Sequence, residues 1–317
     1  MIKYNDLTKD IGEVFFSGHQ ITEVFIGTSK VFPDSPTPPP TPVWGKYRFT
    51  LEDQSVVSAD CDASSAITSA ETTAYGGTMI AAEIGDCVTS IADSTFSYYF
   101  RKLTSITISN SVTSIGNGAF YGCTGLTNVT IPDSVANLDD GVFNGCSNLV
   151  TVTLPSGLTI IPEATFRICS SLTEVNIPSC VTSIGYQAFN QCISLTSITI
   201  PSSVTSIGGY AFVNCTSLSS ITIPNAVATI EDYAFKGCNG LTSITIGSGI
   251  TNIKQEAFFN CSGLTSITVN AVTPPTLGSS AFYNTNECPI YVPAESVNAY
   301  KGAWVAHVTA SRIQPIP

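Results

Sequence analysis

Polar side chains that recur every 23 residues are the strongest candidates for a binding surface in this sequence. They alternate with apolar residues in short segments such as Ser197–Thr199, so they lie on the outward face of the strand that this alternation predicts. A flat array of hydroxyl and amide groups can hydrogen-bond a glycan or the backbone of a partner protein. Ser and Thr also suit any solvent-facing strand, and the sequence leaves both interpretations open. Glu174 and Asn176 interrupt the Ser/Thr pattern and are our first candidates for recognition. The paired positions are Ser105/Thr107, Asn128/Thr130, Thr151/Thr153, Glu174/Asn176, Ser197/Thr199, Ser220/Thr222, Ser243/Thr245 and Ser266/Thr268.

Three tyrosines, Tyr186, Tyr210 and Tyr233, form a second candidate surface at the turns of the same repeat. Tyr is frequent in protein interfaces, so an exposed row of these rings would suit a partner protein. The competing interpretation is that each ring packs between neighbouring repeats.

Groups that could carry out catalysis are few. The two histidines, His19 and His307, lie far apart in the sequence, and no phosphate loop, nucleophile elbow or zinc-protease motif is present. The adjacent carboxylates at 139–140 and 231–232 diverge within turns, so we do not expect an acid–base pair. The stretch Asp60-Cys61-Asp62 offers too few ligands for a calcium loop. We therefore predict no catalytic residue, no metal site and no cofactor, and a protein that is not an enzyme.

The elements that must position these side chains are set by seven regular repeats of 23 residues without an insertion. A fixed period of this length predicts a solenoid in which stacked coils bury one continuous core. In each repeat, L-T-S-I-T-I predicts a strand that a Pro or Gly ends, and V-T-S-I-G predicts a second extended piece. The segment x-A-F-x-x-C predicts a short helical or 3₁₀ turn. The many Ile and Val residues favour strands on more than one face, so we predict a β-rich solenoid of the leucine-rich repeat type. The columns are Phe120, Phe143, Phe166, Phe189, Phe212, Phe235 and Phe258; Cys123, Cys146, Cys169, Cys192, Cys215, Cys238 and Cys261; and Leu126, Leu149, Leu172, Leu195, Leu218, Leu241 and Leu264.

Seven of the eleven cysteines occupy one column of this repeat. Equivalent side chains in stacked coils lie about 4.8 Å apart and point the same way, so seven thiols cannot all pair. Free Cys behaves as a small buried hydrophobe. We expect a ladder of reduced, buried thiols, with a disulfide inside the ladder as the less favoured alternative.

The chain divides into five segments by composition and pattern. We predict a small β head at 1–32, a Pro-rich linker at 33–42, an N-terminal cap at 43–83, the solenoid at 84–287 and a C-terminal cap at 288–317. Six prolines between Pro33 and Pro42 make the linker a semi-rigid spacer. An open solenoid end exposes apolar surface and strand edges, which is why caps are needed. The N-terminal cap contains a predicted hairpin of Lys46–Leu51 and Ser55–Ala59, and the C-terminal cap a strand followed by a helix at Ala294–Trp304.

The head at 1–32 reads as a hairpin in which Val14–Phe16 and Ile21–Ile26 flank a turn at Ser17–Gln20. About thirty residues with this little core are marginal alone, so we expect the head to dock onto another structure. The anchoring residues that we predict are Phe15, Phe16, Val24, Phe25 and Ile26.

The charge distribution argues against nucleic acid and against anionic membrane surfaces as partners. The net charge is −11, of which residues 1–100 carry −8 (thirteen acidic against five basic) and residues 101–317 carry −3 (ten against seven). Nucleic-acid binding needs a basic stripe, which is absent. No apolar run approaches the ~18 residues of a membrane span, and the first residues lack the apolar region of a secretory signal.

The repeat resembles the BspA-like leucine-rich repeat family, whose coils carry A-F-x-x-C-x-x-L-x-x-I-x-I-P-x-x-V-x-x-I-G, over residues 84–304. That resemblance implies a surface protein which binds host matrix, other bacteria or glycans. The head, with ITEVFIGTSKVF before the Pro-rich linker, is similar to small β modules of phage virion proteins. Together these imply a virion-displayed adhesin, a fibre-like decoration that docks through residues 1–32 and presents the solenoid to a cell-surface glycan or protein. By analogy such a fibre is a trimer, and its location is the virion surface. The alternatives are a purely structural spacer or capsid decoration, and a bacterial cell-surface adhesin.

Overall fold

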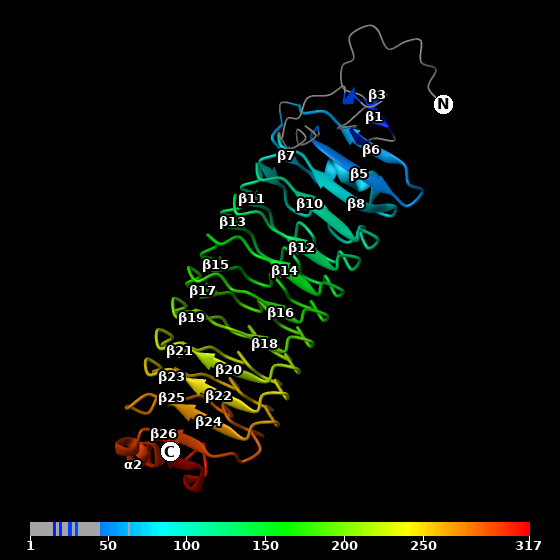
Figure 1. Ribbon diagram of the computed structural model, residues 1–317. Coiled ribbons are helices and arrows are strands. Elements are labelled where there is room, and N and C mark those ends of the chain that lie inside the picture. The colour runs from blue at the N-terminus through cyan, green and yellow to red at the C-terminus, as the bar shows by residue number, and fades with distance from the viewer. Residues whose placement is uncertain (1–14, 17–18, 21–24, 27–28, 31–44, 63) are drawn as a thin grey trace. The chain divides into compact units, whose positions relative to one another are not determined.

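The computed structural model describes residues 45–62 and 64–317, together with the backbone of four two-residue strands nearer the N-terminus (Figure 1). The chain divides into two compact units, Met1–Val43 and Trp44–Pro317. The larger unit is a β-solenoid of stacked 23-residue coils, which confirms the fold class that the repeat predicts. Among the described residues, no helix is long and apolar enough to cross a membrane.

The segments with alternating Ser/Thr and Ile form the main column of parallel strands. Each residue pairs with the residue 23 positions later, as Ser220 pairs with Ser243 and Ile221 with Ile244. Because side chains alternate across a strand, Ile enters the core while Ser and Thr face outward. The strands of this column are β8 (Met79–Ile84), β10 (Ser105–Ile108), β12 (Asn128–Thr130), β14 (Thr151–Thr153), β16 (Glu174–Val175), β18 (Ser197–Ile198), β20 (Ser220–Ile223), β22 (Ser243–Ile246), β24 (Ser266–Val269), β26 (Ile290–Val292) and β27 (Ile313–Pro315).

A second column of shorter parallel strands confirms the expectation of strands on more than one face. The V-T-S-I-G segments and their equivalents form these strands, and the second residue, such as Ile184 or Ile207, is buried in all of them except β25, where Leu277 is half-buried. They are β7 (Ala66–Ile67), β9 (Ser90–Ile91), β11 (Ser114–Ile115), β13 (Asn137–Leu138), β15 (Ile160–Ile161), β17 (Ser183–Ile184), β19 (Ser206–Ile207), β21 (Thr229–Ile230), β23 (Asn252–Ile253) and β25 (Thr276–Leu277).

The third side of each coil differs from the prediction of a helical or 3₁₀ turn. Two residues of each such segment have positive φ, for example Gly118 at 57° and Gly122 at 71°, on either side of Phe120. Left-handed residues at this spacing interrupt any helix. Alternate N–H groups of the segment donate to the next coil, as that of Phe120 does to the Val142 oxygen at 3.0 Å, and those between them donate within the turn. This side is therefore a hydrogen-bonded wall of turns.

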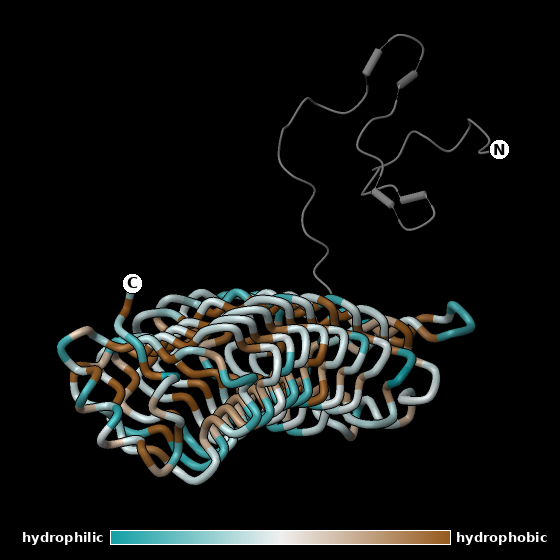
Figure 2. Tube along the Cα trace, turned by 90° about the horizontal axis from the view of Figure 1, so that it is seen from below, coloured by the Kyte–Doolittle hydropathy of each residue, from teal (hydrophilic) through white to brown (hydrophobic). Residues whose placement is uncertain are grey.

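Hydrophobic and hydrophilic residues recur in bands along successive coils (Figure 2), and two ladders fill the core between these sides. The Phe rings stack face to face along the solenoid, with centroids 5.1 Å apart for Phe212 and Phe235 and 5.8 Å apart for Phe143 and Phe166. Each ladder thiol is free and buried, and Cys146 Sγ donates to the carbonyl oxygen of Phe120 at 3.1 Å. The predicted ladder of buried thiols is confirmed.

The N-terminal end of the solenoid contains the predicted hairpin, formed by β5 (Tyr47–Leu51) and β6 (Val56–Ala59). β5 pairs antiparallel with β8, so the hairpin continues the main strand column. Helix α1 (Ser69–Thr72) and the 3₁₀ turn η2 (Thr73–Tyr75) follow. Stacking starts earlier than the predicted first coil at Ile84, because β7 already pairs parallel with β9. This partial coil has no Phe or Cys marker, so the repeat pattern does not reveal it.

A disulfide joins Cys61 to Cys87 at this end, which the sequence analysis missed. The neighbouring Asp62 accepts a hydrogen bond from the buried Lys46 ammonium at 3.2 Å, and Lys46 also pairs with Glu71 at 2.6 Å. Cys61 and Asp62 thus have structural roles. Nowhere in the described part of the chain do three His, Cys, Asp or Glu side chains gather in a way that could hold a metal ion.

The C-terminal end has the predicted strand as β26 and the predicted helix as η3 (Ala294–Ser296) and α2 (Val297–Ala303). Tyr300 and Trp304 are buried against the last coil, where their Oη and Nε1 atoms donate to the carbonyl oxygens of Ala271 and Pro275 at 2.7 and 2.8 Å. After the turn η4 (Ala310–Arg312), β27 pairs with β26 and ends the sheet. Figure 1 places α2 and this C-terminus together at the end of the solenoid.

In the smaller unit, four strands form two tight hairpins in place of the single predicted one. β1 (Phe15–Phe16) pairs antiparallel with β2 (His19–Gln20), and β3 (Phe25–Ile26) with β4 (Ser29–Lys30). Residues 19–20 are therefore a strand and not part of a turn at 17–20. In each hairpin two residues of one strand pair with two residues of the other, so the strands are shorter than the apolar runs in the sequence suggested.

Candidate binding site on the strand face

The outward strand positions predicted from the repeat lie together on one face of the solenoid. Pairing places Asn128 beside Thr151, Thr151 beside Glu174 and Glu174 beside Ser197. Thr151 is half-buried and the others are exposed. The hydroxyl of Thr151 donates to Asn128 Oδ1 at 2.5 Å, so neighbouring side chains in the row contact one another. The exposed predicted residues are Asn128, Thr130, Thr153, Glu174, Asn176, Ser197, Thr199, Ser220 and Thr222.

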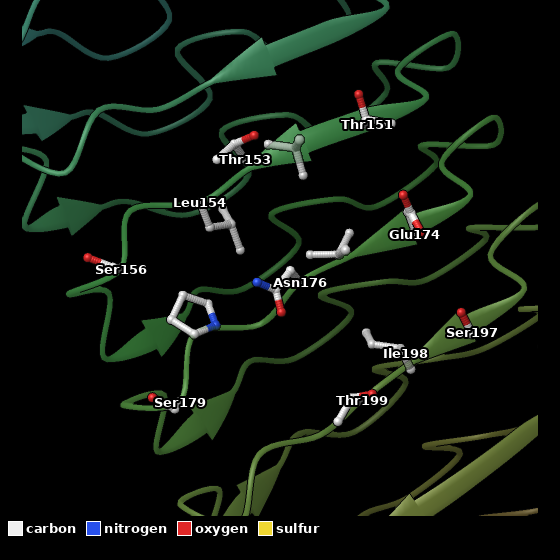
Figure 3. A pocket seen from close by; sticks show the side chains of 13 residues that line it. Thr151, Thr153, Leu154, Ser156, Glu174, Asn176, Ser179, Ser197, Ile198 and Thr199 are labelled. Carbon is white, nitrogen blue, oxygen red and sulfur yellow. The ribbon is translucent and has the colours of Figure 1, made fainter.

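A hollow of about 700 Å³ opens on this face over β14, β16 and β18. Glu174 and Asn176, which break the Ser/Thr pattern, lie in the middle of it, and Thr153, Ser197 and Thr199 lie around them (Figure 3). Apolar groups such as Leu154 and Ile198 form part of its lining. The volume falls within the range of ligand pockets. This part of the face is therefore a hollow and not the flat array of hydroxyls that the sequence suggests.

The hollow coincides with an interruption of the strand ladder. β20 and β22 pair over four residues, whereas β14 pairs with β16 over two and β16 with β18 over two. Asn176 and Thr199 follow these short strands, and among the described residues neither side chain has a hydrogen-bond partner. The chain thus leaves polar groups without partners at the site where it also leaves space.

Glu174 is the one charged residue among the predicted outward positions of Ser105 to Thr268. Within the described part of the chain it forms no ion pair and its carboxylate accepts no hydrogen bond. No Lys, Arg or His lines the hollow. The site therefore has an uncompensated negative charge surrounded by hydroxyl and amide groups.

The predicted tyrosine surface exists, but its rings pack on each other. The centroids of Tyr186 and Tyr210 lie 5.4 Å apart, and those of Tyr210 and Tyr233 lie 4.6 Å apart. The Lys236 ammonium lies 5.0 Å from the Tyr233 centroid and 4.9 Å from that of Phe259. Because the ring faces contact neighbours in the next coil, the interpretation of packing between coils holds for much of this row. Lys236 and Phe259 extend the row beyond the sequence prediction.

The carboxylate pairs do not form an acid–base site. Asp140 Oδ1 accepts the backbone N–H of Glu163 at 3.0 Å, and Asp232 Oδ1 accepts that of Gln255 at 3.0 Å. Glu231 pairs with Lys254 at 2.6 Å. These side chains hold successive coils together.

The ladder thiols are unsuited to nucleophilic chemistry. Burial raises the pKa of Cys146 to about 12 and raises that of Cys192 further above the ordinary range. The nucleophile is the thiolate, which such burial suppresses at neutral pH.

The anchoring residues of the head are only partly covered by the structure. Phe15 and Phe16 form β1 and Phe25 and Ile26 form β3. Val24 lies outside the described residues. The predicted docking role of this set stays a prediction.

The two strand columns, the wall of turns and the regular core spacing define the class of this protein as a leucine-rich repeat β-solenoid. A family model described as BspA type Leucine rich repeat region matches residues 89–219 and 182–303, which together cover more than half of the chain. The chain belongs to the BspA-type leucine-rich repeat family.

Several solved structures are similar to this chain. A leucine-rich repeat protein of T. pallidum is 29% identical over 58% of this chain and 83% of its own, with a TM-score of 0.46. A leucine rich cell surface protein of Faecalibacterium prausnitzii is 25% identical over 86% of this chain and 93% of its own, with a TM-score of 0.42. A comparison with curated protein sequences finds no match.

Proposed function

We propose that this protein is a non-enzymatic adhesin of a bacterial cell surface, which holds a molecule of another cell or of the host in the strand-face hollow. The observation that carries the proposal is the coincidence of the hollow with Glu174 and Asn176 and with the interrupted ladder. A repeat needs no such irregularity for stability, since regular pairing satisfies more backbone groups. Family membership supports a binding role as well.

The disulfide between Cys61 and Cys87 supports an extracellular location. Disulfides form and persist in oxidising compartments and are rare in the cytosol. The virion-displayed fibre that the head suggested has no support in the family match, so we propose the cell-surface location in its place. Docking of residues 1–32 onto another structure, and a trimer, remain predictions that a deletion of residues 1–42 and a light-scattering mass would check.

A purely structural spacer is the competing function, and the outward columns outside the hollow, which are Ser or Thr at every position except Asn128, favour it. The two functions differ in what happens when the hollow is altered. A spacer tolerates changes to any outward residue, because its role depends on length and stiffness alone. An adhesin loses binding only when the hollow is changed.

The test compares fluorescently labelled wild-type chain with the double variant Glu174→Gln/Asn176→Ala on washed bacterial cells, cultured host cells and immobilised matrix proteins. The control is Ser105→Ala/Thr107→Ala, which changes the same strand positions several coils away. We expect wild-type and control to bind at least one of these surfaces and the double variant to bind at least tenfold more weakly. Equal binding by all three proteins, or binding by none, would refute the adhesin proposal.

A further inference from the structure

We infer that the strand-face hollow takes the cationic side chain of an extended segment of a partner protein, an arginine or a lysine, and that Glu174 is its ion-pair partner. This inference rests on the proposed function, because it names the ligand class of the same site. It makes a protein the partner and excludes an acidic glycan.

The charge of the hollow is the first step. Thirteen residues line it, and Glu174 is the one with a formal charge. An anionic ligand such as a phosphate, a sulfate or a uronic acid would lie beside this carboxylate with no Lys, Arg or His to compensate it. A guanidinium or ammonium group would instead supply the missing countercharge, and complementary charge directs both specificity and the rate of encounter.

The geometry around Glu174 suits a guanidinium in particular. A carboxylate accepts two parallel N–H bonds from an arginine side chain. Thr151 and Ser197 are paired with Glu174 in the neighbouring strands, which lie about 4.8 Å away on either side. A guanidinium has five N–H donors, so the hydroxyl oxygens of Thr151 and Ser197 can accept hydrogen bonds from the donors that do not bond to the carboxylate.

A neutral glycan fits the same hollow less well. No Phe, Tyr or Trp lines it, so a sugar ring finds no aromatic face on which to stack. The aromatic row of Tyr186, Tyr210 and Tyr233 belongs to the wall of turns and is absent from the lining. A sugar would also leave the charge of Glu174 uncompensated.

The unpartnered groups of Asn176 and Thr199 argue for an extended peptide. The Asn176 side chain offers one acceptor and two donors, which is the complement of a main-chain peptide group. It lies two residues from Glu174 on the same face of the strand, so one peptide can contact both. Main-chain bonds to an extended segment combined with a pocket for one side chain are a recurrent mode of peptide recognition.

The probes are a capped pentapeptide with a central arginine between Gly and Ser residues, the same peptide with citrulline, and a neutral and an acidic oligosaccharide. Each is titrated into ¹⁵N-labelled full-length chain and followed by the amide shifts of Glu174, Asn176 and Thr199. We expect the arginine peptide to shift these amides. The affinity should be at least tenfold lower for the citrulline peptide and for the Glu174→Gln variant, and it should fall as the salt concentration rises. Glu231→Gln, which removes a half-buried carboxylate paired with Lys254 outside the hollow, should behave as wild type.

Equal shifts with citrulline, no shift at millimolar peptide, or tighter binding of an oligosaccharide at these amides would overturn the inference. The cell-binding assay separates this failure from that of the proposed function. If cell binding depends on Glu174 and Asn176 but an oligosaccharide competes and the arginine peptide does not, the adhesin proposal stands and the ligand class is wrong. If the arginine peptide competes in the micromolar to millimolar range and the citrulline peptide does not, the ligand class is supported.

Discussion

Cys61, beyond the end of β6, is joined to Cys87, in the first turn after β8, by a disulfide that fastens the N-terminal hairpin to the first coil. The bond closes a loop of 26 residues, for which the loss of unfolded-state entropy is worth about 3 kcal/mol. We expect Cys61→Ser/Cys87→Ser to destabilise this end of the solenoid by about 2–4 kcal/mol. The measurement is amide hydrogen exchange across residues 45–110, compared between the variant and the wild type.

The matched control for the disulfide is Cys180→Ser, because Cys180 is a half-buried free thiol at the equivalent position of a later coil. It should leave exchange at the N-terminal end unchanged. If the double variant and the control show the same exchange pattern, the disulfide has no stabilising role.

The Phe ladder is expected to dominate the stability of the central coils. Phe189 is fully buried and its ring stacks on those of Phe166 and Phe212, with centroids 5.4 and 5.2 Å away. Phe189→Ala should cost about 3–5 kcal/mol through lost burial and the cavity that remains. Urea denaturation followed by circular dichroism measures this cost. Phe189→Leu, which keeps most of the volume, should cost clearly less, and an equal loss for both variants would argue against the cavity mechanism.

The repeat spacing was sufficient to predict the solenoid, because Phe, Cys and Leu recur in step and each column has one environment. Pairing of Cys61 with Cys87 was not predictable, since Cys61 lies outside any repeat and contact between them depends on how the hairpin folds onto the first coil. Cys87 and Cys180 occupy the same repeat position, which lies outside the Cys column. This was the available signal that Cys87 does not belong to the thiol ladder.

The hollow was predictable only in part. Glu174 and Asn176 stand out because they break a monotonous pattern, and both line the hollow. The depth of the site depends on β16 and β18 ending after two residues each, and their L-T-x-[IV]-x-I pattern resembles that of the longer strands. Small changes in coil stacking decide the length of these strands, and stacking geometry is not encoded in a single repeat.

The thiol ladder should make stability fall at high pH. Burial raises the pKa of Cys146 to about 12 in the folded chain, against about 8.5 for an exposed thiol. A group with a raised folded pKa keeps the folded chain protonated while the unfolded chain loses its proton, so its contribution is complete below pH 8.5 and is lost as pH rises toward 12. Each such thiol should lower the free energy of unfolding by up to about 1.4 kcal/mol per pH unit in this window.

Urea denaturation of the reduced chain between pH 7 and pH 11 measures the slope. Cys146→Ala removes one titrating group, so its curve should be flatter by about one proton between pH 9 and pH 11. Cys180→Ser changes a half-buried thiol and serves as the control. A Cys146→Ala curve parallel to that of wild type would show that the ladder thiols do not govern the alkaline transition.

The C-terminal cap should protect the last coil through Trp304. Its indole is 1% exposed, its Nε1–H donates to the Pro275 oxygen at 2.8 Å and its ring lies 5.8 Å from that of Phe282. Trp304→Ala removes this cover, leaves the Pro275 carbonyl unpaired and should cost about 3–5 kcal/mol. Val305→Ala is the control, since Val305 is 73% exposed and next in sequence.

Because an uncovered solenoid end exposes apolar surface and a strand edge, Trp304→Ala should also self-associate in analytical ultracentrifugation while Val305→Ala does not. If Trp304→Ala sediments as wild type and unfolds at the same urea concentration, β27 and the rest of the cap are sufficient to close the solenoid.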